Sequence, residues 1–411
     1  MRLNLLKNPA LVLFVSFLLV QAGAGAAANV DWTDRKEYDL VLTIRSESAP
    51  QKRLALLDSW SQSYPKTALA RARQELYLDT YQSLGDHVKM FETAKQIQAS
   101  QPEDPVALYW LTVLAPQQPN NPATVDIGEK AAKGVLAALD KNFAADKKPS
   151  ALSDADWQKQ RTGVEVIGHR TLGWASWQRG NLSAAADEFM ICVQKDSGNA
   201  EISSWLGIVS AIDTGKQPQA LWYLARSTNK DIATPLPDDQ RRQVNSILEN
   251  MYASYHGSLE GLDELRKVSL SKAIPPPEFS IDPATVVNAR RAEMELSMTN
   301  PELAAWLSMH RQLTAPDGEK YFASDVQGKP LPKLRGTVLR ASPLRAPREI
   351  VLSMSESNQP DVTLKLTVPL TRPAPAGANL SFQGVGVSFT KEPFSLIITA
   401  DTAQPESRTQ P

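Results

Sequence analysis

The sequence predicts a mainly α-helical chain, with an α-α helical solenoid followed by a small all-β barrel or sandwich domain. Three observations predict this fold class. Apolar residues recur at three- and four-residue spacings from residue 34 to 267, and the pair Leu172-Gly173 returns as Leu206-Gly207 after 34 positions (206 minus 172). From residue 336 to 400 the chain instead carries short β-rich segments separated by Pro, Gly, Ser or Asn. Because 411 residues are too many for one compact core, we expect two or three domains.

The clearest repeat joins two helices through the turn Gly180-Asn181. Leu172 and Gly173 lie on one stripe of the first helix, and Ala185 and Phe189 share one face of the second. Gly173 and Ala185 let the two backbones approach, while Phe189 fills the space beyond. This pattern resembles the tetratricopeptide repeat, whose signature carries Leu-Gly on one helix and Ala-x-x-x-Phe on the next. The resemblance implies a stack of helix-turn-helix units that binds other proteins and seldom performs chemistry.

Further units are predicted on both sides of this repeat. The chain departs from the family pattern at Ser176 and Ser197, where the family has an aromatic residue and a helix-ending proline. A second unit follows, with Ala220 on its second helix, and residues 53–140 fit degenerate units, which makes four or five in total. The residues expected to pack the repeats are Leu172, Gly173, Ala185, Phe189, Leu206, Gly207 and Ala220.

Composition places the remaining boundaries around a helical repeat domain at residues 34–267. The Pro-rich segment 268–283 cannot continue a helix and is expected to link two domains. Residues 284–314 are expected to form two helices that cap the open end of the solenoid. A β domain with five strands is expected at residues 325–402, similar to an OB-type barrel only in strand length and spacing. Residues 403–411 are expected to be a disordered tail.

Residues 1–28 show the three parts of a secretory signal in order. Arg2 and Lys7 precede an apolar run from Ala10 to Val20, and small residues follow as far as Ala28. We expect cleavage and a periplasmic or secreted protein, with no membrane span afterwards. The alternative is a retained N-terminal membrane anchor. Cleavage changes the formal net charge from −1 to −3, which predicts no global attraction to nucleic acid or anionic membrane.

A stripe on the first helix of the clearest repeat is the candidate partner-binding surface. Arg170, Trp174 and Trp177 are spaced i, i+4, i+7 and lie beside the predicted packing face. Arginine and tryptophan are enriched in binding hot spots, and in the resembled family the first helices line a concave groove, so we expect a protein or peptide partner there. The same surface is extended by Gln178, Glu201, Ser204 and Ile208. The alternative is that both tryptophans pack between repeats.

A run of basic residues marks the entry to the β domain. No acidic residue interrupts it, and its members are Lys329, Lys333, Arg335, Arg340, Arg345 and Arg348. A basic OB-like barrel can bind single-stranded nucleic acid, but export would remove the chain from cytosolic nucleic acid, so that partner is not expected. Two interpretations stay open: a solvated face, or a patch that binds an anionic envelope polymer.

The sequence contains no recognisable motif for catalysis, metal binding or cofactor binding. The four histidines are far apart, and the nucleophile-elbow, phosphate-loop and zinc-protease patterns are absent. Cys192, the one cysteine, is expected to be a small buried side chain. We therefore predict an exported scaffold or adaptor that is not an enzyme and has no metal or cofactor. The alternative is an extracytoplasmic enzyme or enzyme accessory whose repeats recruit the substrate.

Overall fold

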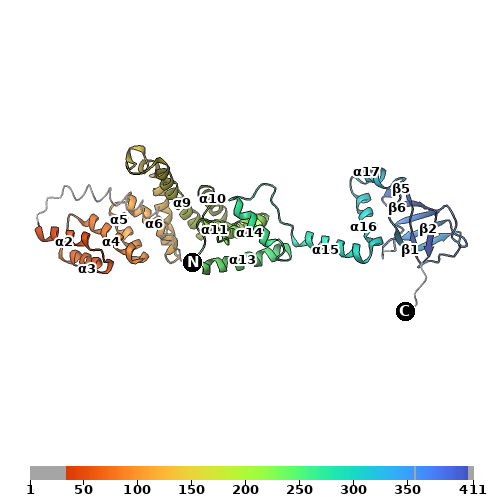
Figure 1. Cartoon of the computed structure of the whole chain (residues 1–411), viewed down its shortest axis with the longest axis horizontal. Coiled ribbons are helices and arrows are strands. Elements are labelled where there is room, and N and C mark those ends of the chain that lie inside the picture. Colours follow the sequence, from red (N-terminus) through yellow and green to blue (C-terminus); the bar gives the residue numbers. More distant parts are fainter. Residues whose placement is uncertain (1–33, 356–357, 406–411) are drawn as a thin grey trace. The chain divides into compact units, whose positions relative to one another are not determined.

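The computed structural model describes residues 34–355 and 358–405. The chain divides after Ile281 into a helical unit and a smaller unit that contains the β-sheet (Figure 1). The predicted fold class, a mainly α chain with a small C-terminal β domain, is confirmed. The predicted signal peptide and residues 406–411 of the predicted tail lie outside the described residues.

Successive helices make up the first unit. They are α2 (Arg35–Ser46), α3 (Pro50–Ser63), α4 (Ala70–Leu84), α5 (His87–Ser100), α6 (Pro105–Leu114), α7 (Pro122–Ala137), α8 (Leu139–Asn142), α9 (Asp154–Gln178), α10 (Leu182–Lys195), α11 (Ala200–Ser210), α12 (Gln217–Ser227), α13 (Asp238–His256) and α14 (Leu262–Ser271). Short 3-10 turns η2 (Ala115–Gln117), η3 (Ala145–Lys147) and η4 (Thr214–Lys216) lie between them.

These helices form a stack of pairs. The pairs are α2 with α3, α4 with α5, α6 with α7, α9 with α10, and α11 with α12, and each packs against the next. Helices α13 and α14 both pack against α12. Five pairs within the described ranges agree with the predicted four or five units.

Two turns, one of them the predicted turn at Gly180-Asn181, have the local geometry that their sequences favour. Gly85 (φ +69°) and Gly180 (φ +77°) adopt left-handed backbone, which glycine tolerates without steric cost. The following residues, Asp86 and Asn181, cap α5 and α10: their side chains accept hydrogen bonds from Lys89 N and Ala184 N. These Gly-Asp and Gly-Asn steps therefore end one helix and begin the next.

The predicted close approach between α9 and α10 is confirmed. Phe189 is fully buried, and a Cβ atom added to Gly173 would lie 2.5 Å from Phe189 Cε1. In the next pair a Cβ on Gly207 would lie 2.8 Å from the Leu224 side chain. Ala185, Leu206, Ala220 and Cys192 are buried as expected, whereas Leu172 is only half-buried. Small residues thus set the spacing of both helix pairs.

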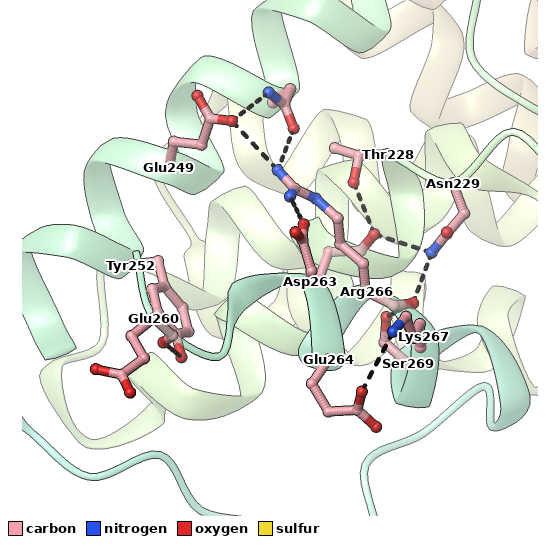
Figure 2. Close-up of polar contacts among 12 residues, drawn as sticks. Thr228, Asn229, Glu249, Tyr252, Glu260, Asp263, Glu264, Arg266, Lys267 and Ser269 are labelled. Carbon is pink, nitrogen blue, oxygen red and sulfur yellow. Dashed lines mark hydrogen bonds and ion pairs between the residues drawn. The ribbon is translucent and has the colours of Figure 1, made fainter. Parts of the chain in front are cut away.

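A polar network joins the last two helices of this unit. Figure 2 shows Arg266 of α14 between Asp263 of the same helix and Glu249 of α13. The Arg266 Nη1 donates to Asp263 Oδ1 (2.6 Å), and its Nη2 lies 3.3 Å from Glu249 Oε1. The Tyr252 hydroxyl of α13 donates to the Glu260 carbonyl at 2.8 Å. Polar contacts therefore supplement the packing of both helices on α12.

The segment predicted as a linker, 268–283, in part belongs to the helical unit. Helix α14 continues to Ser271, and Phe279 packs edge-on against Trp222 of α12 with ring centroids 4.7 Å apart. Buried Arg226 of α12 donates to three carbonyls at the end of α14, those of Ser269, Leu270 and Lys272. The boundary between the units thus lies at the end of the proline-rich segment.

The predicted capping helices belong to the second unit, so that prediction was wrong. Helix α15 (Ala284–Thr299) has no buried residue and therefore covers no apolar face. Helix α16 (Pro301–Thr314), which Asn300 caps, buries Trp306, Met309 and Leu313 in the core of the β domain. The apolar face of α16 therefore covers the sheet.

The second unit is built on one seven-stranded sheet. After α16 come α17 (Gly318–Tyr321) and a π-helical turn, η5 (Phe322–Val326). The strands are β1 (Leu334–Ser342), β2 (Glu349–Ser353), β3 (Val362–Leu366), β4 (Asn379–Phe382), β5 (Val385–Lys391), β6 (Phe394–Ala400) and β7 (Ala403–Pro405). Their order is β5-β6-β3-β2-β1-β4-β7, with β3 parallel to β6 and the other neighbouring pairs antiparallel.

The sheet differs from the predicted five-stranded barrel or sandwich. It is open, with β5 and β7 as its edges. The expected strand at residues 380–389 is divided into β4 and β5, which lie far apart in the strand order. Residues 403–405, predicted as part of a disordered tail, form β7 and pair with β4. Sequence patterning did not reveal β7, because three residues are too few to show alternation.

Candidate functional site

The predicted partner-binding stripe lies mostly inside the helical unit. Four of its members are buried, with exposed fractions of 1% for Arg170, 5% for Trp174, 7% for Glu201 and 0% for Ser204. Trp177, Gln178 and Ile208 are half-buried, and Trp177 packs edge-on against Phe189 and Trp205. The four buried members cannot contact a partner, so for Arg170, Trp174, Glu201 and Ser204 the prediction was wrong. The alternative, that the tryptophans pack between repeats, is confirmed.

Arg170 instead stabilises the end of α6. Its Nη2 donates to the Val113 carbonyl (3.3 Å), and the neighbouring Thr171 hydroxyl donates to the Thr112 carbonyl (2.8 Å). These carbonyls belong to the last turn of α6, where the helix has no further N–H groups to offer. A cation at a helix C-terminus is also favoured by the helix dipole. Arg170 and Thr171 therefore fasten α9 to the end of α6.

Arg170 also faces Glu201 of α11 in the interior. Its Nη1 lies 3.8 Å from Glu201 Oε2, and its guanidinium lies 5.9 Å from the Trp205 ring centre. Burial raises the pKa of Glu201 to about 7, and the Arg170 charge offsets this only in part. Both carboxylate oxygens of Glu201 are buried without a hydrogen-bond partner among the described residues. This pair links two repeats, but it is closed off from any partner.

An apolar cavity in the first helix pairs is the better candidate site. This N-terminal cavity has a volume of about 200 Å³. Its walls come from three helices and the residue before α4: Tyr38, Val41, Leu42 and Arg45 of α2, Trp60 of α3, and Leu69, Ala72 and Leu76 beside or in α4. Apolar walls with a single charged side chain are typical of binding sites, and about 200 Å³ is below the size of most small-molecule pockets and suits one side chain.

The floor of the cavity is held in place by polar contacts around Trp60. Its Nε1 donates to Glu37 Oε1 at 2.8 Å, and the Arg73 guanidinium lies 5.4 Å from its ring centre. Arg73 in turn donates to the Tyr64 carbonyl at 2.8 Å. Because Glu37 accepts from its Nε1 and Arg73 covers one face of its ring, the Trp60 side chain has little freedom to rotate into the cavity. The cavity is therefore preformed.

The opening of the cavity combines an apolar and a cationic group. Leu42 is 47% exposed, and Arg45, one helical turn further along α2, is exposed. Within residues 34–355 and 358–405 Arg45 has no ion pair or hydrogen-bond partner. Burial raises the pKa of Glu75 in α4, and the positive charge of Arg45 opposes this shift only in part. An incoming carboxylate would thus find an available cation beside an apolar pocket.

Sequence reasoning missed this site, although one signal was present. Tyr38, Leu42 and Arg45 have the spacing i, i+4, i+7, the same spacing that drew attention to Arg170, Trp174 and Trp177. The two stripes differ in their neighbours. Helix α9 packs against α6, α7 and α10. Among the described elements, α2 packs closely only against α3. Helix α2 is the first helix of the described range, and its stripe lines the N-terminal cavity.

The structure separates the basic residues at the β domain into two groups. Lys329 pairs with Asp325 (3.7 Å) and Lys333 with Glu302 (2.9 Å), and Arg335 has an interaction of its own. Arg340, Arg345 and Arg348 lie at or beyond the end of β1, are exposed, and have no ion pair within the described chain. The six residues therefore do not form one surface.

Other chemistry-bearing residues are scattered. His169 Nδ1 lies 2.7 Å from Glu188 Oε2, a contact between α9 and α10, and His310 packs on Trp306 and Phe394. Among the described residues no group of three or more His, Cys, Asp or Glu side chains is arranged to hold a metal ion. No helix in that same part of the chain is long and apolar enough to cross a membrane.

Comparison with known proteins adds no family to this description. No protein-family model and no curated protein matches the chain.

Proposed function

We propose that the protein is a non-enzymatic scaffold that binds a segment of a partner protein at the N-terminal cavity. The observation that carries the proposal is the preformed apolar space among α2, α3 and α4, with Arg45, which has no ion pair among the residues that the structure describes, at its opening. An apolar side chain of the partner fills the cavity, and an adjacent carboxylate pairs with Arg45. Export through the N-terminal signal and membership of the tetratricopeptide repeat class are parts of the same proposal.

The size of the cavity supports a side-chain anchor. An apolar protein cavity of about 150 Å³ holds a benzene molecule, so about 200 Å³ accommodates a Leu, Met or Phe side chain. Burial of one such side chain contributes about 1.5–3 kcal/mol. A rigid stack of helices loses little entropy on binding, which favours capture of a flexible segment.

A random peptide library tests the proposal. On the chain, we expect enrichment of peptides with a large apolar residue next to Asp, Glu or a terminal carboxylate. Ala72→Phe, which fills the cavity, should abolish their binding, and Arg45→Glu should weaken it about tenfold or more through charge reversal. Lys52→Glu, an exposed charge reversal on α3 outside the cavity, is the matched control. Peptides that bind Ala72→Phe as tightly as the wild type would contradict the proposal.

A further inference from the structure

One end of the β-sheet presents two exposed apolar side chains on neighbouring loops. Leu344, in the connection from β1 to β2, is 82% exposed, and Val368, just after β3, is 59% exposed. Leu344 has the highest exposed fraction among the large apolar side chains of the described chain. An apolar side chain exposed at a loop tip has an unfavourable solvation free energy in water, which is relieved when the side chain enters an apolar phase.

The two loops are held together by backbone hydrogen bonds. Leu370 N donates to Pro347 O (3.2 Å), and Leu366 N donates to Arg348 O (2.8 Å). Arg348 N donates to Ser342 O at 3.0 Å, which closes the first loop on itself. Both tips therefore belong to one surface at the same end of the sheet, which we call the loop face.

Unpaired cations surround these apolar tips. They are exposed, come from both loops and the adjoining strands, and have no ion pair within the described residues: Arg340, Arg345, Arg348, Lys365 and Arg372. Two acids lie beside this group: Glu349, the cross-strand neighbour of Lys365, and Asp401, which accepts from the Thr367 hydroxyl at 2.7 Å. Cations exceed acids on this face, although the whole chain is nearly neutral.

We propose that the loop face binds an anionic lipid surface. Leu344 and Val368 enter the boundary between headgroups and acyl chains, and the arginines meet the lipid phosphates. Apolar tips distinguish this occupant from a soluble anionic polymer, because a polymer in water offers charge but no apolar phase for Leu344. Binding is peripheral and reversible, since only two side chains enter the membrane. This inference is independent of the N-terminal cavity.

Vesicle co-sedimentation tests the inference with the chain from Asn29 onward, which retains every described residue and lacks the N-terminal apolar run. We expect binding to vesicles of phosphatidylcholine mixed with phosphatidylglycerol, weaker binding at high salt, and little binding to phosphatidylcholine alone. Leu344→Ser should lower the partition coefficient about tenfold, the amount that loss of one buried leucine predicts. Arg345→Glu with Arg348→Glu should lower it roughly tenfold or more.

Matched variants on the exposed helix α15 serve as controls. Met298→Ser removes an apolar side chain that is 80% exposed, and Arg291→Glu reverses an exposed charge, and both should bind vesicles as the wild type does. Inorganic polyphosphate is the comparison ligand. If the arginine variants lose polyphosphate and vesicles equally while Leu344→Ser loses neither, the loop face binds anionic polymers and the membrane inference is overturned. Absence of binding to mixed vesicles would overturn it as well.

Discussion

At the scale of single residues, the buried pair of Arg170 and Glu201 shows how the same residue types serve packing or recognition. Arginine and tryptophan are common at binding surfaces, yet here Arg170 caps α6 and contacts Trp205 in the interior. Its charge is retained because the free carbonyls at the end of α6 and the carboxylate of Glu201 surround it. Without those partners a buried charge would be strongly destabilising.

The pKa of Glu201 makes stability depend on pH. Its pKa is raised from 4.5 to about 7 in the folded chain, so the folded state holds a proton that the unfolded state has released between these values. The resulting stabilisation is fully present below pH 4.5 and is lost as the pH rises through about 7. Relative to Glu201→Gln, the wild type should lose on the order of 3 kcal/mol of unfolding free energy between pH 4.5 and 8.

Urea unfolding at several pH values measures this effect. Glu201→Gln is the reference because it keeps the shape of the side chain and cannot titrate. Equal pH dependence of the two proteins would show that the pKa of Glu201 is the same in the folded and unfolded chain.

The sequence shows which residue types lie on the stripe of Arg170, Trp174 and Trp177, but it does not show how exposed these side chains are. A helix packed on one side has a polar face, whereas α9 packs against α6, α7 and α10, and from Arg161 to Gln178 none of its residues is exposed. The number of neighbours of a helix is a tertiary property. For that reason Trp174 was misplaced, whereas Gly173 and Phe189, which follow from contact within one pair, were predicted correctly.

At the scale of elements, the close approach of α9 and α10 depends on the absence of a side chain at Gly173. A methyl group there would lie 2.5 Å from Phe189 Cε1, too close for an unshifted core. Gly173→Ala should therefore destabilise the chain by about 1–3 kcal/mol, although alanine favours helix by about 1 kcal/mol.

A double-mutant cycle with Phe189→Leu separates this clash from other effects. Leucine leaves room for the added methyl group, so the double variant should lose less stability than the sum of the two single variants. Thermal unfolding measures all four proteins. Strict additivity would mean that Gly173 and Phe189 do not compete for the same space.

Elements bounded by strong local signals were predictable, and elements defined by distant partners were not. The turn at Gly180-Asn181 has its own capping chemistry, so it was found, and the turn at Gly85-Asp86 carries the same local signal. Strand β7 exists only through its pairing with β4, and α16 finds its apolar partner in the sheet rather than in the solenoid. An amphipathic pattern shows that a helix packs against another element of the chain, but it does not identify that element.

At the scale of the whole molecule, each unit has its own core. The helical unit is organised around clusters that include Trp110 and Trp60, and the second unit around Trp306 and the sheet. Helix α15, which follows the boundary, has no buried residue, and Arg290 and Arg291 on it are exposed. Units of this kind fold separately when the chain between them is cut.

Limited proteolysis checks this organisation. Trypsin should cleave first after Arg290 or Arg291, and both fragments should keep their circular dichroism and cooperative melting. Replacing both arginines with glutamine, which trypsin does not recognise, is the matched control and should delay the first cut. Early cleavage after the buried residues Arg170 or Arg226, or unfolding of either fragment, would show that the two units depend on each other.

The central claim is that a partner's apolar side chain occupies the N-terminal cavity, and site-specific photocrosslinking tests it most directly. Benzoylphenylalanine replaces Leu42 at the opening of the cavity, or Val88 on α5, which is 60% exposed and outside it. After irradiation with the selected peptide, mass spectrometry should find the crosslink from position 42 at or beside the apolar anchor residue. Crosslinks from position 88 with equal yield, or attachment at position 42 far from the anchor, would contradict the account.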